Sequence, residues 1–414
     1  MIRDIALAHG DAPALRSVLR PDQLRTLEAI AACGTAAMGF HEEACDACDH
    51  RRLVPNTCGN RSCPHCQGRV RAEWVEARTD ELLPVGYFHV VLTLAPDLRP
   101  LAKAYPRIVL GALMQAAAEV IDGLCRDPRR LGGEVGQLVV LHTWTRDLGW
   151  HPHVHVIVTA GGWDAVHQRW IPARGYGPQQ TPFLLPVEVL RAAFQRRMRT
   201  LLLRAYRQGR FADGPSEFFP ELASAATFAA RLDDSIASRW VLRIEPPFGG
   251  PVQVLKYLGA YVGRVAISPK RVLAHDAQAG TVTYTWTTNA EPDRPQQGTI
   301  PAVEFLQRFA QHILPPRFQR IRFRGLWATA HRETKLRQVQ RHLNGLNPTP
   351  GQPPSPPDQP PPDPRSACTC CGRGHYRRLP GPCQRPSARE RRRMLASIRQ
   401  ELRTQAPQEV TAVA

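Results

Sequence analysis

The chain has 414 residues, of which 43% are hydrophobic, so it can bury a core and global disorder is excluded. Its 54 Lys and Arg residues outnumber 36 Asp and Glu residues, and the net charge of +18 favours a polyanionic partner, more commonly nucleic acid than a membrane surface. No stretch approaches the run of about 18 apolar residues of a membrane-spanning helix, and the N-terminus lacks a signal-peptide core. We therefore expect a cytoplasmic protein of about two or three domains. In that compartment its 11 cysteines indicate metal binding rather than disulfides.

The first predicted elements are one or two short helices within residues 1–40, where leucine and isoleucine recur near helical spacing. Residues 41–70 then hold five cysteines and few large apolar side chains, so a bound metal rather than a hydrophobic core must organise them. We predict that residues 1–80 comprise these helices and a zinc-binding module.

Residues 81–335 form the predicted main domain. Apolar runs and helical periodicity predict, in chain order, a strand at 87–94, a helix at 98–124, strands at 137–144 and 153–160, a helix at 185–208, a strand at 240–245, a helix at 252–262 and a strand at 282–287. Some strands follow one another directly and others are separated by helices. This order predicts an α+β fold in which helices flank a mostly antiparallel sheet.

The C-terminal region begins with a linker. Ten prolines fall within residues 348–364, so residues 336–365 are expected to be stiff, extended and disordered. Residues 366–414 combine a basic stretch with a group of cysteines near His375, namely Cys368, Cys370, Cys371 and Cys383. Their irregular spacing leaves both a second zinc site and unbound thiols open.

Two Cys-x-x-Cys pairs lie fourteen residues apart in the N-terminal module. Pairs at this distance can place four thiolates around zinc, and the polar residues between them fit a buried core poorly. We therefore predict a structural zinc ion bound by Cys45, Cys48, Cys63 and Cys66. Two alternatives remain open: Cys58 could replace one of the four, or a nearby histidine could complete a three-cysteine site, the candidates being His41, His50 and His65.

Two histidines lie one residue apart in the predicted strand at 153–160. Side chains alternate along a strand, so His153 and His155 share a face with Cα atoms about 6–7 Å apart, a span that two imidazoles can bridge to one metal ion. Burying both without a shared partner would be costly, although packing histidines are the alternative. We predict both as metal ligands. His142 joins them if strand pairing places it opposite His155, whereas a shift by one residue would turn it away.

Tyr257 and Tyr261 lie four residues apart in a predicted helix, so their phenols share one face. Such tyrosines are usually packing residues, and only the nearby histidines change this interpretation. A tyrosine that attacks a DNA phosphate forms a covalent phosphotyrosyl bond, and a divalent ion would polarise that phosphate. We predict both as nucleophiles, flanked by candidate phosphate ligands Lys256, Arg264, Lys270 and Arg271.

A final motif combines arginines with apolar residues. Arg320, Arg322 and Arg324 alternate with Ile321 and Phe323. In a strand, this alternation buries one face and presents a cationic row to DNA phosphates, or alternatively a merely solvated face.

Together these motifs resemble the two-tyrosine rolling-circle transposases of the insertion-sequence-91 family, whose nuclease belongs to the HUH group (His, hydrophobic, His). The resemblance covers roughly residues 25–330. It is carried, in family order, by CGTAAMGFHEEACDACDH, NTCGNRSCPHC, YFHVVLTL, LHTWTRDLGWHPHVHVIVTAGG, KYLGAYVGRVAISPKRV and HILPPRFQRIRFRGLWA. The sequence departs from the family at Ser62, where a histidine is usual.

The resemblance implies a five-stranded antiparallel sheet beside the tyrosine helix, and Mg²⁺ or Mn²⁺ at His153 and His155. It also implies a bacterial, nucleoid-associated enzyme that cleaves and rejoins single-stranded DNA at element ends and target DNA through a 5′-phosphotyrosyl intermediate. Three alternatives remain: a plasmid rolling-circle replication initiator or relaxase, a non-catalytic zinc-dependent nucleic-acid-binding protein, and a metal-dependent hydrolase that activates water.

Overall fold

The computed structural model describes residues 1–67, 78–176, 181–213, 216–238, 240–247, 265–288, 291, 293–346, 367–380 and 385–404. At its centre is a five-stranded sheet in the order β10-β3-β5-β4-β14, in which all neighbours are antiparallel. The strands are β3 (Tyr87–Thr93), β4 (Gly136–Trp144), β5 (Trp150–Thr159), β10 (Leu242–Glu245) and β14 (Ile321–Gly325). The α+β prediction is confirmed, and β14 lies at the outer edge. Part of the predicted disordered linker at 336–365 is instead helical, because residues 337–346 form α11 with apolar side chains packed against the sheet, and the rest of the linker lies outside the described residues.

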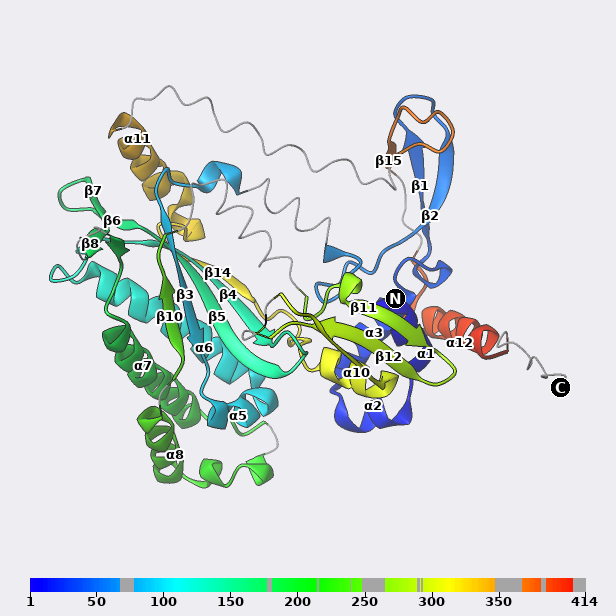
Figure 1. The fold of residues 1–414 in the computed structure, drawn as a ribbon, viewed down its shortest axis with the longest axis horizontal. Coiled ribbons are helices and arrows are strands. Elements are labelled where there is room, and N and C mark those ends of the chain that lie inside the picture. Colours follow the sequence, from blue (N-terminus) through cyan, green and yellow to red (C-terminus); the bar gives the residue numbers. More distant parts are fainter. Residues whose placement is uncertain are drawn as a thin grey trace.

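One face of this sheet is covered by helices (Figure 1). They are α5 (Arg99–Ala104), α6 (Pro106–Arg126), α7 (Val187–Arg207) and α8 (Ala225–Ala237). Alternate residues of β3 and β5, including Val90 and Val156, form the main hydrophobic core with them. The predicted helix at 98–124 is divided because Pro106 cannot continue α5 and instead begins α6. By length and composition α6 could cross a membrane, but it packs in this core.

The other sheet face is divided between two environments. At one end, Tyr87, Leu138 and Ile157 pack against residues of α11 (Arg337–Leu346) and the turn before it. Tyr87 stacks on Trp327 with ring centroids 5.6 Å apart. At the other end, near the β4–β5 turn, the same face carries the histidines. Two hairpins extend the sheet region, β6 (Gly161–Asp164) with β7 (Arg169–Pro172) and β8 (Arg174–Tyr176) with β9 (Thr181–Phe183).

A second lobe surrounds the N-terminus. Its helices are α1 (Ile2–His9), α2 (Pro13–Val18), α3 (Pro21–Ala32), α10 (Ala302–Ala310) and α12 (Ala388–Thr404). They share a hydrophobic core with the sheet of β11 (Val272–Asp276), β12 (Thr281–Trp286) and β13 (Gln296–Pro301). Short amphipathic helices cannot bury their apolar faces alone. The N-terminal helices therefore pack also against α10 and β12, which lie beyond residue 80, the predicted end of the N-terminal domain.

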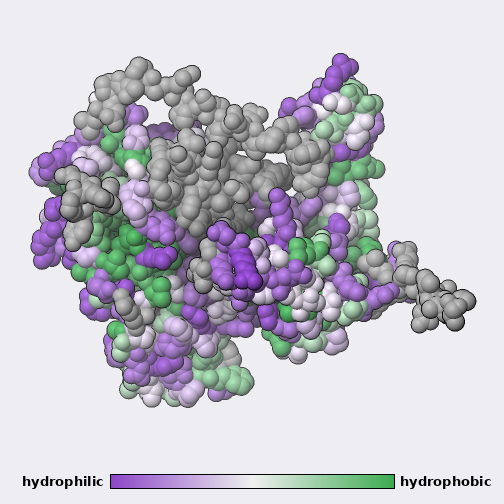
Figure 2. Space-filling view, viewed as in Figure 1, coloured by the Kyte–Doolittle hydropathy of each residue, from purple (hydrophilic) through white to green (hydrophobic). Residues whose placement is uncertain are grey.

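A small three-stranded sheet projects from this lobe as an arm (Figures 1 and 2). It consists of β1 (Phe40–Cys45), β2 (Arg51–Pro55) and β15 (Tyr376–Arg378). β15 is antiparallel to β1, with Cys45 opposite Tyr376. Figure 2 shows that the arm mixes hydrophilic and hydrophobic residues on its surface. The C-terminal region therefore returns to the N-terminal module.

Candidate metal centre and nucleic-acid surfaces

Three histidines converge on the face of the central sheet opposite α6. One ring nitrogen each of His142, His153 and His155 lies within 4.8 Å of the others. His142 is opposite His153, not opposite His155 as the sequence prediction required. The difference is two residues, which returns a side chain to the same face, so His142 still joins the cluster.

Hydrogen bonds orient two of these rings. His153 Nδ1 lies 2.7 Å from the carbonyl oxygen of His151, which can only accept, so Nδ1–H donates and Nε2 carries the lone pair. His155 Nδ1 lies 2.8 Å from His89 Nε2, and His89 Nδ1 lies 2.7 Å from Glu245 Oε2. The carboxylate accepts from His89 Nδ1–H, so His89 Nε2 accepts from His155 Nδ1–H. The Nε2 atom of His155 thus also carries a lone pair.

Burial favours the neutral form of His153 and His89. It lowers the pKa of His153 to about 4, and it also lowers the pKa of His89 despite the opposing effect of Glu245. His142 is 3% exposed, and its ring stacks on Trp144 at 4.5 Å between centroids. Three clustered imidazoles, two of them oriented by hydrogen bonds, could hold a divalent metal ion and leave coordination positions for phosphate oxygens.

The cysteines of the N-terminal module do not gather as predicted. Cys63 and Cys66 lie with Cys33 and Cys58, whereas Cys45 and Cys48 lie with Cys368 and Cys371. The prediction of one site for all four is therefore corrected. The reason is the hairpin: Cys45 and Cys48 lie at its tip, while β2 returns the chain to its base over five residues, a distance of about 16 Å.

The group of Cys33, Cys58, Cys63 and Cys66 resolves the role of the fifth thiol. The Sγ atoms of Cys33 and Cys58 lie 3.7 and 3.6 Å from that of Cys66. Cys58 is thus a full member, and the group is complete without a residue at the Ser62 position. Sequence reasoning missed Cys33, at the end of α3, although the motif CGTAAMGF that carries the family resemblance begins with it.

The histidines considered as alternative zinc ligands have other partners. His41 contacts Asn56 and Glu43, at 2.9 and 3.2 Å, and His50 Nδ1 lies 2.9 Å from the Tyr376 hydroxyl. These two histidines, together with His65, His375 and Cys370, are absent from the cysteine groups that the described residues form. Cys383 lies outside the described residues.

The predicted arginine row lies on β14 and on Arg320 directly before it, on the sheet face opposite the histidines. Arg322 donates to the Gly111 carbonyl oxygen of α6 at 3.4 Å, and Arg320 donates to Gln67 at 3.4 Å. Burial lowers the pKa of Arg320 to about 10. Arg324 is exposed. All three line a groove of about 740 Å³ beside β14, together with Arg61 and Arg317.

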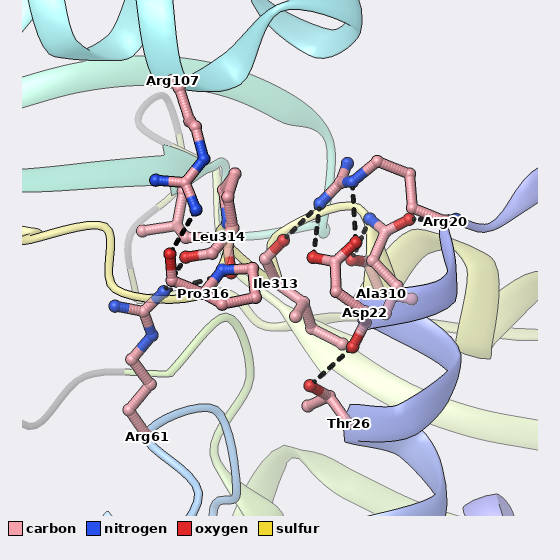
Figure 3. Close-up of polar contacts among 11 residues, drawn as sticks. Arg20, Asp22, Thr26, Arg61, Arg107, Ala310, Ile313, Leu314 and Pro316 are labelled. Atoms are coloured by element: carbon pink, nitrogen blue, oxygen red, sulfur yellow. Dashed lines mark hydrogen bonds and ion pairs between the residues drawn. The ribbon is translucent and has the colours of Figure 1, made fainter.

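Arg61 connects the zinc module to this groove (Figure 3). Its guanidinium donates to the carbonyl oxygens of Leu314 and Pro315, at 3.0 and 2.7 Å, and to that of Phe318. Arg107 of α6 donates to the Pro316 carbonyl oxygen in the same loop. The loop that leads into β14 is therefore held from both the zinc module and the main domain.

Of the remaining predicted site residues, two lie beside β11 and four lie outside the described residues, namely Tyr257, Tyr261, Lys256 and Arg264. Lys270 is exposed just before β11. Arg271 donates to the Thr285 carbonyl oxygen at 2.8 Å and to that of Arg146, so it supports local structure.

Comparison with known proteins identifies the family of the histidine-containing domain and that of the N-terminal module. Residues 136–335, which include the three clustered histidines, match a family described as "Putative transposase", and residues 5–94 match a "Transposase zinc-binding domain". With the four clustered sulfurs, the second match identifies a structural zinc module. The chain is 38% identical to "Putative transposase y4qJ" of Sinorhizobium fredii, across 86% of this chain and 87% of that protein. It is 29% identical to the "Transposase for insertion sequence element IS801" of Pseudomonas savastanoi pv. phaseolicola, across 80% and 77%. This chain belongs to the insertion-sequence-91 family of transposases.

Proposed function

We propose that this transposase cleaves and rejoins single-stranded DNA at the ends of its element as an HUH-type strand transferase. The observation that carries the proposal is the cluster of His142, His153 and His155, in which His89 and His151 orient two of the rings. A divalent ion held there, Mg²⁺ or Mn²⁺, would stabilise the charge that develops on the scissile phosphate. The nucleophile must then come from a residue beside the cluster.

Tyr257 and Tyr261 are the proposed nucleophiles. The phenol oxygen of one forms a bond to phosphorus, the bond from phosphorus to the 3′ oxygen breaks, and the phenol proton leaves with the new 3′ hydroxyl. The resulting 5′-phosphotyrosyl bond conserves the energy needed for rejoining, which is the reverse step. A second tyrosine allows another strand to be cut while the first remains occupied.

The residues on either side of 248–264 support this assignment. The segment follows closely after Glu245, whose carboxylate contacts His89. It ends directly before Val265, which lines a small cavity with Trp144, and the Trp144 ring stacks on His142. Glu245 before the segment contacts His89, and Val265 after it lines the same cavity as Trp144, so both flanks lie near neighbours of the histidine cluster.

The charged surface supports a DNA substrate. Arg317 and Arg324 are exposed in the groove beside β14, and Lys270 is exposed on the second lobe. Because each phosphate neutralised by a cation releases counterions, such a surface attracts a DNA backbone without regard to base sequence. The same charge would hold the protein on the bacterial nucleoid.

A covalent-adduct assay tests the mechanism. Oligonucleotides from both ends of the parent element are incubated with the full-length protein and Mn²⁺ or Mg²⁺, and adducts are resolved on denaturing gels. We expect an adduct that Tyr257→Phe plus Tyr261→Phe abolishes and that His153→Ala greatly reduces. Tyr206→Phe, remote on α7, is the matched control. Cleavage that persists in the double tyrosine variant would instead indicate a water-activating hydrolase, and binding without cleavage on any element end would indicate a non-catalytic protein.

A further inference from the structure

We propose that a second structural zinc ion is bound by Cys45, Cys48, Cys368 and Cys371. This ion links the loop before β15 to the β1–β2 turn. The four Sγ atoms lie within 4.8 Å of one another. Cys45 and Cys48 come from the β1–β2 turn, and the other two come from the loop before β15. Neither Cys368 nor Cys371 falls within the residues matched by the two family models.

The distances between sulfurs identify the kind of site. Cys48 Sγ lies 3.7 Å from Cys368 Sγ, and Cys45 Sγ lies 3.7 Å from Cys371 Sγ. A disulfide would need about 2.05 Å. A tetrahedron with zinc–sulfur bonds of about 2.3 Å has edges of about 3.8 Å between sulfurs. The cysteine group within the matched zinc-binding domain has the same spacing, 3.6 to 3.7 Å, and serves as an internal reference.

Both loops form the turns expected of zinc knuckles. Each contributes a Cys-x-x-Cys pair, and backbone N–H groups approach the sulfurs. Ala47 N donates to Cys45 Sγ at 3.3 Å, Cys370 N to Cys368 Sγ at 3.3 Å, and Gly374 N to Cys371 Sγ at 3.4 Å. Such donors stabilise thiolates. Four thiolates this close need a divalent cation to offset their mutual repulsion.

Gly374 permits this close approach of the two loops. A Cβ atom at this position would lie 2.4 Å from Cys45 Sγ and 2.6 Å from the Ala47 Cβ. Any other residue would therefore push the C-terminal loop away from the sulfurs. The contact depends on the missing side chain rather than on an unusual backbone conformation.

The arm buries few apolar side chains. Its hydrophobic cluster, within the described residues, comprises Cys45, Cys368 and Tyr376, with Cys371 packed against them. Polar contacts add the Arg377–Asp46 ion pair at 2.9 Å and a guanidinium, that of Arg52, 3.6 Å from the Tyr376 ring centroid. A core this small requires a metal or another cross-link to fold stably. The zinc ion thus provides the stability that side-chain burial cannot.

Metal stoichiometry of the full-length protein tests the inference. Native mass spectrometry of protein purified with zinc is expected to show that the double variant Cys368→Ser plus Cys371→Ser holds one ion fewer per chain than the wild type. Cys370→Ser, a matched control at an exposed thiol between them, should hold as many ions as the wild type. A double variant that holds as many ions as the wild type would overturn the proposal.

Cobalt substitution provides a second measurement that is independent of enzymatic activity. Tetrahedral cobalt thiolate sites absorb through sulfur-to-metal charge transfer, so the double variant should show about half of the wild-type intensity per chain. Gly374→Ala, which leaves all ligands in place, should weaken binding of the second cobalt ion in a competition titration. An unchanged spectrum in the double variant would contradict ligation by all four thiolates.

Discussion

At the histidine cluster, each side chain determines which ring nitrogen of its neighbour carries the proton. Glu245 determines which nitrogen of His89 carries the proton, and His89 in turn determines the tautomer of His155. His89 does not belong to the three-histidine group, so it is a positioning residue rather than a predicted ligand. Its effect on metal binding should therefore be separable from folding.

We expect His89→Ala to weaken Mn²⁺ binding by about 10- to 100-fold, because orienting partners of ligand histidines typically contribute that much. Cleavage measured against Mn²⁺ concentration should shift to higher metal concentrations and recover at saturation. Glu245→Gln should shift the curve in the same direction. His167→Ala, at an exposed histidine paired with Asp164, is the control and should leave the curve unchanged. An unshifted curve for His89→Ala would show that His89 does not position His155 for metal binding.

The protonation state of His312 affects the stability of the folded protein. It is buried between the Thr143 hydroxyl and the Leu148 carbonyl oxygen, and burial lowers its pKa to about 4. Because the unfolded chain binds this proton more readily, the contribution of neutral His312 is fully present above about pH 6.5 and falls as the pH drops toward 4. The loss amounts to about 3 kcal/mol at most.

Urea unfolding at pH 7.5 and pH 5 checks this expectation. His312→Gln should lower the stability at pH 7.5 but reduce the difference between the two pH values relative to the wild type. His167→Ala again serves as the control. If the pH difference is the same in both proteins, His312 does not titrate as its burial predicts.

At the scale of secondary-structure elements, the arginines of β14 and of the residue before it have two different roles that the sequence does not distinguish. Arg320 and Arg322 contact Gln67 and α6, whereas Arg324 is exposed in the groove. We expect Arg324→Ala to weaken binding of single-stranded DNA and to reduce the slope of log affinity against log salt by about 0.7, without a change in unfolding temperature. Arg320→Ala should instead lower the unfolding temperature. Equal effects of both substitutions on the salt slope would show that the whole row contacts DNA.

The loop before β14 depends on a single guanidinium. Arg61→Ala removes donors from three carbonyl oxygens, those of Leu314, Pro315 and Phe318, and should cost about 2–3 kcal/mol of stability. Arg61→Lys should recover little, because an ammonium group cannot span the three acceptors as a planar fork does. Arg129→Ala, at an 89% exposed side chain, is the control for chemical denaturation.

At the scale of the whole molecule, the zinc module shares a hydrophobic core with distant parts of the chain. Cys33, Cys63 and Cys66 belong to the same hydrophobic cluster as Phe305 of α10 and Tyr284 of β12. Removing zinc should therefore increase hydrogen exchange not only in the module but also in α10, while α7, which packs in the other core, stays protected. Exchange monitored by mass spectrometry with and without a chelator tests this. An increase confined to residues 33–66 would mean that the module unfolds alone.

The sequence predicts local patterns better than partners that are distant along the chain. Alternation placed His153 and His155 on one face, and β5 confirms this. The sequence left the pairing of His142 open; the structure places it opposite His153 rather than His155, beside a register shift between His142 and Trp144 that the residue types do not encode. The grouping of the cysteines was wrong because nothing in the spacing of Cys45 and Cys48 encodes a partner near residue 370. The tyrosine prediction falls on residues outside those described.

The pairing of β1 with β15 joins residues roughly 330 positions apart in the chain, Cys45 and Tyr376 among them. During synthesis at about 5 to 20 residues per second, β1 must therefore wait about 20 to 60 s for its second neighbour to leave the ribosome. Until then its outer edge is an unpaired strand edge, which can recruit other chains. Copies of the gene truncated before residue 376 should accordingly yield aggregation-prone protein, so assembly of the arm depends on translation past β15.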